Sequence, residues 1–178
     1  MKFKTHVVGG LSAGVLGHQL LSQSLPSIES ETNLMVGAFF IASSVIGSLV
    51  PDIDHRGSYI GRRLKPISAT VQLIAGHRGL THSPLFVMGL TALLWFVSNH
   101  FLSGQELIIA QYGTLGFSLG LFSHLFLDMI TKGGIPLLYP FSKQKFSILP
   151  LKTGGFGEPI VMIMMILLMV FSITKSTF

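Results

Sequence analysis

Five apolar stretches constrain this chain most strongly, because each approaches the length that a helix needs to cross a membrane. They cover residues 5–21, 34–50, 84–101, 107–128 and 159–173. A bilayer core about 30 Å thick requires roughly 20 apolar residues of helix, and fewer where polar residues anchor the ends. The stretches therefore predict an all-α, polytopic integral membrane protein with about five transmembrane helices.

The scarcity of charge excludes a soluble fold. Only 11% of the 178 residues are charged, whereas a soluble domain of this size has about 25%. Such a chain has too few charged side chains to cover a surface that faces water. The length fits one domain, so we expect residues 1–178 to form a single membrane-embedded unit.

The first stretch follows Met-Lys-Phe-Lys and therefore resembles a signal peptide. It lacks a small-residue cleavage site before the acidic residues that follow, and it contains His6. We expect it to be retained as a helix. Its glycines and serines favour close packing against other helices, whereas the Met-rich stretch 159–173 suits a position facing lipid.

The basic residues are distributed unevenly between the two ends of these stretches. If the N-terminus is cytoplasmic, segments 1–4, 51–83 and 128–158 lie inside and hold 11 of the 12 Lys and Arg residues. Cytoplasmic loops of membrane proteins carry such an excess. We therefore expect the N-terminus inside and the C-terminus outside. The net charge of +5 is attributed to topology and lipid headgroups rather than to nucleic acid.

The two long inner connections differ in character. Residues 66–75 are partly apolar and indicate a short helix lying on the membrane surface. Residues 131–157 are rich in Gly, Pro and aromatic residues. Such a segment predicts an irregular loop in the membrane interface rather than a solvated linker.

Each apolar stretch brings at least one His, Asp or Glu to this inner end. The residues are His6, Asp52, Asp54, His77, His82, His124, Asp128 and Glu158. Ionisable side chains beside lipid are costly, so those that meet there are candidates for function. The pattern predicts one polar site, built from all five helices at the cytoplasmic face.

The spacings within this set fit a metal site. His124 and Asp128 are four residues apart, so both project from one face of a helix. The chain has no cysteine, and imidazoles with carboxylates suit Zn²⁺, Mn²⁺ or Fe²⁺ better than Ca²⁺ or Mg²⁺. The candidates outnumber the three or four ligands that one Zn²⁺ takes. A second ion and carboxylates that orient the imidazoles are both left open.

Three residues are candidates for catalysis. Arg78 lies between candidate ligands, where a guanidinium would bind an anionic oxygen through two hydrogen bonds. Asp54 or Glu158 would act as general base, although Glu158 also fits a charge at a helix N-terminus. Whether His55 joins the site is left open. Arg62, Arg63 and Lys65 add positive charge at the mouth of the site, and the excess of basic residues inside is the alternative explanation for them. The outer end holds His18 and His100, which we expect to be structural.

Four segments carry a family resemblance. They are Thr-His at 5–6, Pro-Asp-Ile-Asp-His at 51–55, His-Arg-Gly-Leu-Thr-His-Ser at 77–83, and the segment 124–142 that begins His-Leu-Phe-Leu-Asp. Together they resemble the YdjM-like family of bacterial and archaeal membrane-bound metal-dependent hydrolases, some of which are LexA-regulated. The resemblance runs from residue 6 to about residue 158 and implies a bacterial cytoplasmic (inner) membrane location. It implies as metal-site residues His6, Asp52, Asp54, His77, His82, His124 and Asp128.

The hypothesis that follows is a membrane-bound hydrolase with one or two divalent metal ions, foremost zinc, with manganese or iron as alternatives. We expect it to cleave a phosphoester or other ester of a lipid or amphiphilic substrate, and the expected substrate is a small or lipid-linked anion. The His-x-x-x-Asp pair is also similar to that of zinc-dependent phospholipase C and P1-type nucleases. Expected partners are membrane lipids and no nucleic acid. The alternatives are a structural or regulatory metal site and a metal or proton transporter.

Overall fold

The computed structural model describes residues 1–22, 30–76 and 79–177. The five predicted stretches form long helices, namely α1 (Phe3–Ser22), α2 (Ser30–Gly47), α5 (Pro84–Phe101), α6 (Gly104–Met129) and α7 (Gly157–Thr177). The described residues form no strand beyond two isolated bridges, Thr131 with Leu151 and Ile135 with Phe146. The prediction of an all-α fold is confirmed.

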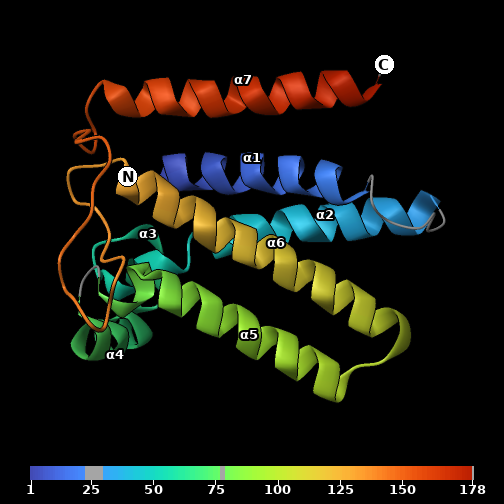
Figure 1. Ribbon diagram of the computed structural model, residues 1–178, viewed down its shortest axis with the longest axis horizontal. Coiled ribbons are helices and arrows are strands. Elements are labelled where there is room, and N and C mark those ends of the chain that lie inside the picture. The colour runs from blue at the N-terminus through green and yellow to red at the C-terminus, as the bar shows by residue number, and fades with distance from the viewer. Residues whose placement is uncertain (23–29, 77–78, 178) are drawn as a thin grey trace.

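The long helix α6 crosses α1 and α2 and also packs on α5, while α7 packs on α1 (Figure 1). Glycines let α6 and α2 touch along their backbones. A Cβ atom at Gly120 would lie 1.9 Å from the carbonyl oxygen of Ser44, and one at Gly116 would lie 2.3 Å from that of Phe40. Larger side chains would force the two helices apart, so the small residues set their close packing.

In the part of the chain that the structure describes, three helical segments are long and apolar enough to cross a membrane, namely Leu34–Asp54, Pro84–Phe101 and Gly157–Lys175. Helices α1 and α6 have 20 and 26 residues, so they are about 30 and 39 Å long. Both carry several buried polar or small residues, which lowers their hydropathy. The structure thus supports three of the five expected crossings by length and composition.

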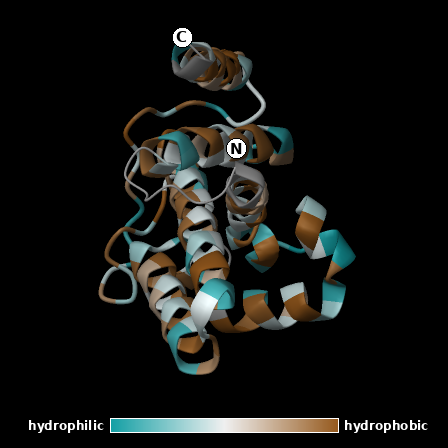
Figure 2. Cartoon of the chain, turned by 90° about the vertical axis from the view of Figure 1, so that its right-hand side faces the viewer, coloured by the Kyte–Doolittle hydropathy of each residue, from teal (hydrophilic) through white to brown (hydrophobic). Residues whose placement is uncertain are grey.

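Helix α7 lies at the outside of the bundle. Only 6% of its most apolar window is buried, and Figure 2 shows it beside the C label, set apart from the other helices and coloured mostly brown. Its exposed side chains include Ile163, Met164, Leu167 and Leu168. An uncovered apolar helix of this kind is what a lipid-facing position requires.

The short elements gather at one end of the bundle, where the N-terminus lies (Figure 1). Helix α2 ends there and leads into the 3₁₀ helix η1 (Pro51–Asp54), then α3 (Tyr59–Arg63) and α4 (Lys65–Ala75), before η2 (Leu80–His82) starts α5. The predicted surface helix 66–75 is therefore present as α4. The irregular connection between α6 and α7 lies at the same end, as predicted.

Candidate metal centre

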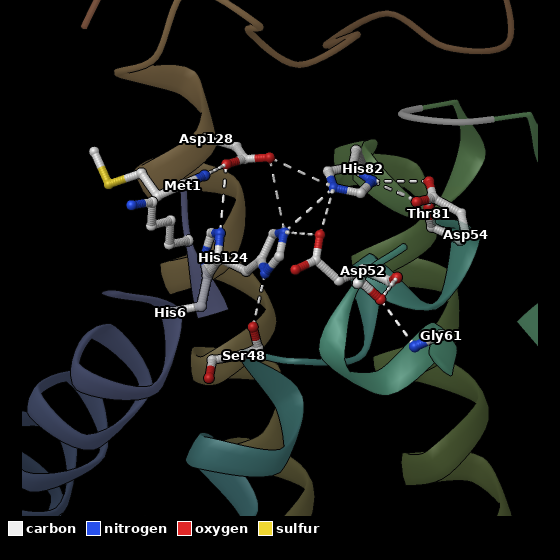
Figure 3. Close-up of polar contacts among 12 residues, drawn as sticks. Met1, His6, Ser48, Asp52, Asp54, Gly61, Thr81, His82, His124 and Asp128 are labelled. Atoms are coloured by element: carbon white, nitrogen blue, oxygen red, sulfur yellow. Dashed lines mark hydrogen bonds and ion pairs between the residues drawn. The ribbon is translucent and has the colours of Figure 1, made fainter. Parts of the chain in front are cut away.

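Six of the predicted polar residues meet at this end of the bundle (Figure 3). The first turns of α1 and the last turns of α6 lie side by side there, and the two 3₁₀ helices complete the wall. Helix α1 supplies His6, α6 supplies His124 and Asp128, η1 supplies Asp52 and Asp54, and η2 supplies His82.

Capping interactions hold the two short helices in place. The Ser83 hydroxyl accepts a 3.2 Å hydrogen bond from the Phe86 backbone N–H and so caps α5, which fixes the end of η2 where His82 lies. The Ser58 hydroxyl donates a 2.8 Å hydrogen bond to the backbone carbonyl of Asp52. Because the same hydroxyl caps α3, η1 is tied to the helix that follows it.

Ligand atoms of His82, His124 and Asp128 converge on one space, and an Asp52 oxygen lies beside both imidazoles. The Nε2 atoms of His82 and His124 lie 3.2 Å apart. Asp52 Oδ1 lies 3.9 Å from the first and 3.8 Å from the second. Asp128 Oδ2 lies 3.5 Å from His82 Nε2 and 3.9 Å from His124 Nε2. The donors come from η1, η2 and α6, which are distant in sequence.

The other ring nitrogen of His82 and of His124, Nδ1, already has a hydrogen-bond partner. His82 Nδ1 lies 3.1 Å from Asp54 Oδ2, and His124 Nδ1 lies 2.7 Å from the backbone carbonyl oxygen of Ser48. A carboxylate and a carbonyl only accept hydrogen bonds, so each Nδ1 carries a proton and donates it. In the neutral rings, Nε2 then presents a lone pair to the shared space, as in histidines that ligate metals.

The donor atoms of His82, His124 and Asp128 fit a divalent metal ion. In the neutral rings both Nε2 atoms are hydrogen-bond acceptors, as is the carboxylate oxygen, and these side chains are at most 1% exposed, so the three atoms repel one another unless a proton or a cation lies between them. Ligand atoms about 2.0–2.1 Å from a tetrahedral ion lie about 3.3–3.4 Å from one another. The three separations of 3.2, 3.5 and 3.9 Å are close to that value. Two imidazoles and a carboxylate, with the Asp52 carboxylate beside them, form a donor set suited to a transition metal.

His6 adds a fifth donor on the α1 side. Its buried ring stacks on that of His124, with 3.8 Å between centroids, and its Nε2 lies 3.5 Å from Asp128 Oδ1. Neither ring nitrogen has a hydrogen-bond partner in the described part of the chain, which is costly for a buried imidazole. His6, Asp52 and His124 bring donor atoms within 4.8 Å of one another. The Met1 amino group also contacts Asp128 Oδ1.

Asp54 orients a ligand in this structure and does not face the shared space. Its Oδ2 accepts hydrogen bonds from the Thr81 hydroxyl and from His82 Nδ1, so it lies behind the His82 ring. The predicted roles of Asp54 as metal ligand and general base stay predictions, and in this structure its Oδ2 contacts His82 Nδ1 instead of the Nε2 side of the ring. The carboxylate fixes the imidazole through the nitrogen that faces away from the other donors.

Glu158 joins α7 to the start of the chain. One carboxylate oxygen accepts hydrogen bonds from the Lys2 backbone N–H at 2.5 Å and the Thr5 hydroxyl at 2.6 Å. The other accepts the Gly154 backbone N–H at 2.5 Å. These three hydrogen bonds hold the buried Glu158 carboxylate away from the cluster of candidate metal ligands. The structure does not place Glu158 as a general base, and the helix N-terminal interpretation fits its position.

His77 and Arg78 lie outside the described residues, so their roles as ligand and anion-binding group stay predictions. His55 is exposed and belongs to neither group of candidate ligands. His18 lies in the second half of α1 and His100 near the end of α5, at the opposite end of the bundle.

A cavity of about 540 Å³ opens beside the cluster. Asp52 lines it and is 23% exposed, whereas the side chains of His82 and His124 are 0% exposed. Three basic residues, Lys2, Lys4 and Arg62, also line the cavity. A molecule in this cavity would therefore reach the donor cluster at Asp52.

The contact of Ser48 with His124 could not be predicted from the sequence, because Ser48 contributes its backbone carbonyl. The last carbonyls of a helix lack partners within the helix, and α2 ends at Gly47 with Pro51 following shortly after. That helix end is the signal that a carbonyl is available to a neighbouring imidazole. The sequence carries no signal that pairs it with His124.

The chain is similar to one family model and to bacterial proteins. The family model described as YdjM inner membrane protein matches residues 1–177. The chain is similar to the uncharacterized protein YvsG of Bacillus subtilis, with 32% identity over 162 residues, which are 91% of this chain and 88% of that protein. It is similar to the inner membrane protein YdjM of Escherichia coli, with 38% identity over 107 residues, which are 56% of this chain and 48% of that protein. No solved structure matches.

Proposed function

The chain belongs to the YdjM inner membrane protein family, and from this premise we propose that it is a metal-dependent hydrolase of the inner membrane. Its substrate is a lipid or another amphiphile that carries an ester, foremost a phosphoester, and cleavage takes place at the cytoplasmic interface. One observation carries the proposal. Three buried ligand atoms, from His82, His124 and Asp128, lie within 4.8 Å of one another, and the partly exposed Asp52 carboxylate lies 3.8–3.9 Å from both imidazoles.

The residues in and around the cluster have different roles in this proposal. A divalent metal held there would polarise a phosphoryl oxygen and lower the pKa of water. Asp54 and the Ser48 carbonyl keep the protons of His82 and His124 on Nδ1, so both Nε2 atoms stay available as ligands. Asp52 is the donor that also lines the cavity, so a substrate meets the cluster on its side. Arg78 remains the group predicted to stabilise charge on the phosphoryl oxygens.

We also propose that all five long helices cross the membrane, with the N-terminus in the cytoplasm and the C-terminus outside. Helices α1 and α6 are the less apolar ones because they lie inside the bundle and contact α2, α5 and α7. The Lys and Arg residues of segments 1–4, 51–76 and 130–156 lie at the site end of the structure. This distribution supports a donor cluster at the inner interface.

Two observations favour hydrolysis over the alternatives. Transporter ligands lie near the bilayer midplane, whereas the donors here lie at one end of the bundle. A structural zinc site is closed by four protein ligands, whereas a catalytic site has three and keeps one position open. His82, His124 and Asp128 form a group of three, and Asp52 beside them is 23% exposed and lines a cavity of about 540 Å³.

The test compares wild type with His124→Ala, purified in detergent and assayed for release of phosphate or headgroup from phosphoester lipids. We expect activity that chelation abolishes and that Zn²⁺, Mn²⁺ or Fe²⁺ restores, and none in His124→Ala. His100→Ala, at the opposite end of the bundle, should keep full activity. A metal-loaded wild type that cleaves neither phosphoester nor carboxylic ester lipids would refute hydrolysis. Metal uptake into proteoliposomes that His124→Ala abolishes would favour transport instead.

A further inference from the structure

Three basic residues line the cavity beside Asp52. Lys2, Lys4 and Arg62 line its wall, and none of them forms an ion pair within the described ranges of the chain. Asp52 is the acidic residue in that wall, and its carboxylate is directed to His82 and His124. The cavity therefore has an excess of positive charge at the entrance to the donor cluster.

Membrane topology alone does not explain this arrangement, because it sets the side of the membrane and not the direction of a side chain. Arg62 and Arg63 are neighbours in α3 and differ in their surroundings. The Arg63 guanidinium lies over the Tyr59 ring, 4.4 Å from its centroid, and Arg63 is absent from the cavity wall. Arg62 faces the cavity. The two residues therefore form a natural pair of test and control.

We infer that this cavity is an anion-binding subsite, in which Arg62, Lys2 and Lys4 bind the non-bridging oxygens of a phosphate ester next to Asp52. The inference rests on the proposed function, because it supplies the substrate group that the donor cluster would act on. A guanidinium binds two phosphate oxygens at once, whereas lysines contribute point charges. Arg62 is thus the specificity-determining residue of the subsite.

Asp52 lines the subsite and also lies beside the imidazoles of the donor cluster. Binding of a metal in the cluster should therefore affect binding of an anion in the cavity. Asp52 Oδ1 lies 3.8–3.9 Å from the Nε2 atoms of the two central histidines, and the same residue lines the cavity. Without a cation in the cluster, the carboxylate repels an anion in the cavity. A divalent cation offsets that charge. Phosphate binding should therefore strengthen when metal is bound.

The experiment is a calorimetric titration of inorganic phosphate into the full-length protein in neutral detergent, with and without bound Zn²⁺. We expect binding to the zinc-loaded protein that weakens at least tenfold after chelation. Arg62→Gln should weaken phosphate binding about tenfold in the zinc-loaded protein, while Arg63→Gln changes it less than twofold. Arg62→Lys keeps the charge without the paired hydrogen bonds and should lie between wild type and Arg62→Gln. It also serves as the test if Arg62→Gln does not fold.

A second arm identifies the source of the phosphate. Glycerol phosphate and a diacylglycerol phosphate in mixed micelles are compared as ligands. Tighter binding of the lipid, with the Arg62 effect retained, supports a subsite for a lipid headgroup. Equal binding supports a subsite for a soluble phosphate ester.

Two results would overturn the subsite. One is a zinc-loaded wild type that binds no phosphate, and the other is an equal loss of binding in Arg62→Gln and Arg63→Gln. Either leaves the proposed hydrolase intact if the protein holds its metal. Conversely, phosphate binding that depends on Arg62 in a protein unable to bind any divalent metal supports the anion subsite and contradicts the proposed function.

Discussion

His82 and His124 are prepared as ligands by the atoms behind them. A carboxylate of Asp54 and a backbone carbonyl of Ser48 hold the Nδ1 protons, so the lone pairs of Nε2 point into the same space. Without these partners, each ring could turn or place its proton on the other nitrogen. Groups that orient a ligating histidine in this way typically contribute 10- to 100-fold in metal affinity.

Asp54→Asn tests this role at the scale of one residue. The substitution keeps the size of the side chain and removes its charge, so we expect a folded protein whose affinity for Zn²⁺ falls about 10- to 100-fold. Asp52→Asn removes a donor atom itself and should cost more. Competition with a chromophoric chelator measures both. If Asp54→Asn loses as much affinity as Asp52→Asn, Asp54 is a ligand and the orientation described here is wrong.

Glu158→Gln separates a structural carboxylate from the donor cluster. Three hydrogen bonds hold this buried side chain, and hydrogen bonds to a charged group contribute about 1.5–3 kcal/mol each. We expect thermal unfolding in detergent at a lower temperature, with unchanged metal content per chain. Loss of the metal from a folded Glu158→Gln protein would contradict the assignment of Glu158 to the α1–α7 contact.

Individual residues show where sequence alone reaches its limit. The convergence of His6, His82, His124 and Asp128 follows from apolar stretches that end at one face, and the structure brings these side chains together. The sequence did not separate Asp52 from Asp54, because two carboxylates two residues apart look alike until the turn between them is built. In the structure, one faces the donors and the other the back of His82.

At the scale of elements, the bundle depends on contacts that only glycine permits. Gly47, Gly116 and Gly120 bring the backbones of α2 and α6 together, and this contact places the end of α6 beside η1. The existence of the five helices could be predicted from hydropathy and the small residues predicted close packing. The choice of partner could not, because glycines occur in several helices and only the structure shows which ones meet.

Gly120→Ala tests this contact. Alanine is the better helix former by about 1 kcal/mol, yet its Cβ would lie 1.9 Å from the Ser44 carbonyl oxygen. We therefore expect a net destabilisation of about 1–3 kcal/mol from overpacking, seen as a lower unfolding temperature. Gly89→Ala in α5 is the control, because a Cβ atom there meets nothing within 4 Å. It should be neutral or slightly stabilising, and equal losses for both variants would contradict the packing.

At the scale of the whole molecule, the donor cluster, the short helices and nearly all basic residues share one end of the bundle. A polar site at the membrane interface can receive a headgroup while an attached chain remains in the bilayer. The chain has few charged residues. Most of them lie at one end of the bundle, where the basic residues bear on the orientation in the membrane and several acidic residues belong to the site.

Single cysteine substitutions test which end of the bundle faces the cytoplasm, because the chain has no cysteine of its own. Glu106→Cys lies in the first turn of α6, and Lys145→Cys lies in the exposed connection between α6 and α7. In intact cells, a membrane-impermeant maleimide should label Glu106→Cys at once and Lys145→Cys only after permeabilisation. The reverse pattern would place the donor cluster on the outer face.

We expect the cluster of imidazoles and carboxylates to hold a transition metal. X-ray absorption at the metal edge tests this on wild-type protein purified without chelators, with His124→Ala measured alongside. We expect at least one metal ion per chain, nitrogen and oxygen neighbours at about 2.0–2.1 Å, and loss of the signal in His124→Ala. A wild type without stoichiometric metal, or a metal signal that persists unchanged in a folded His124→Ala, would contradict it.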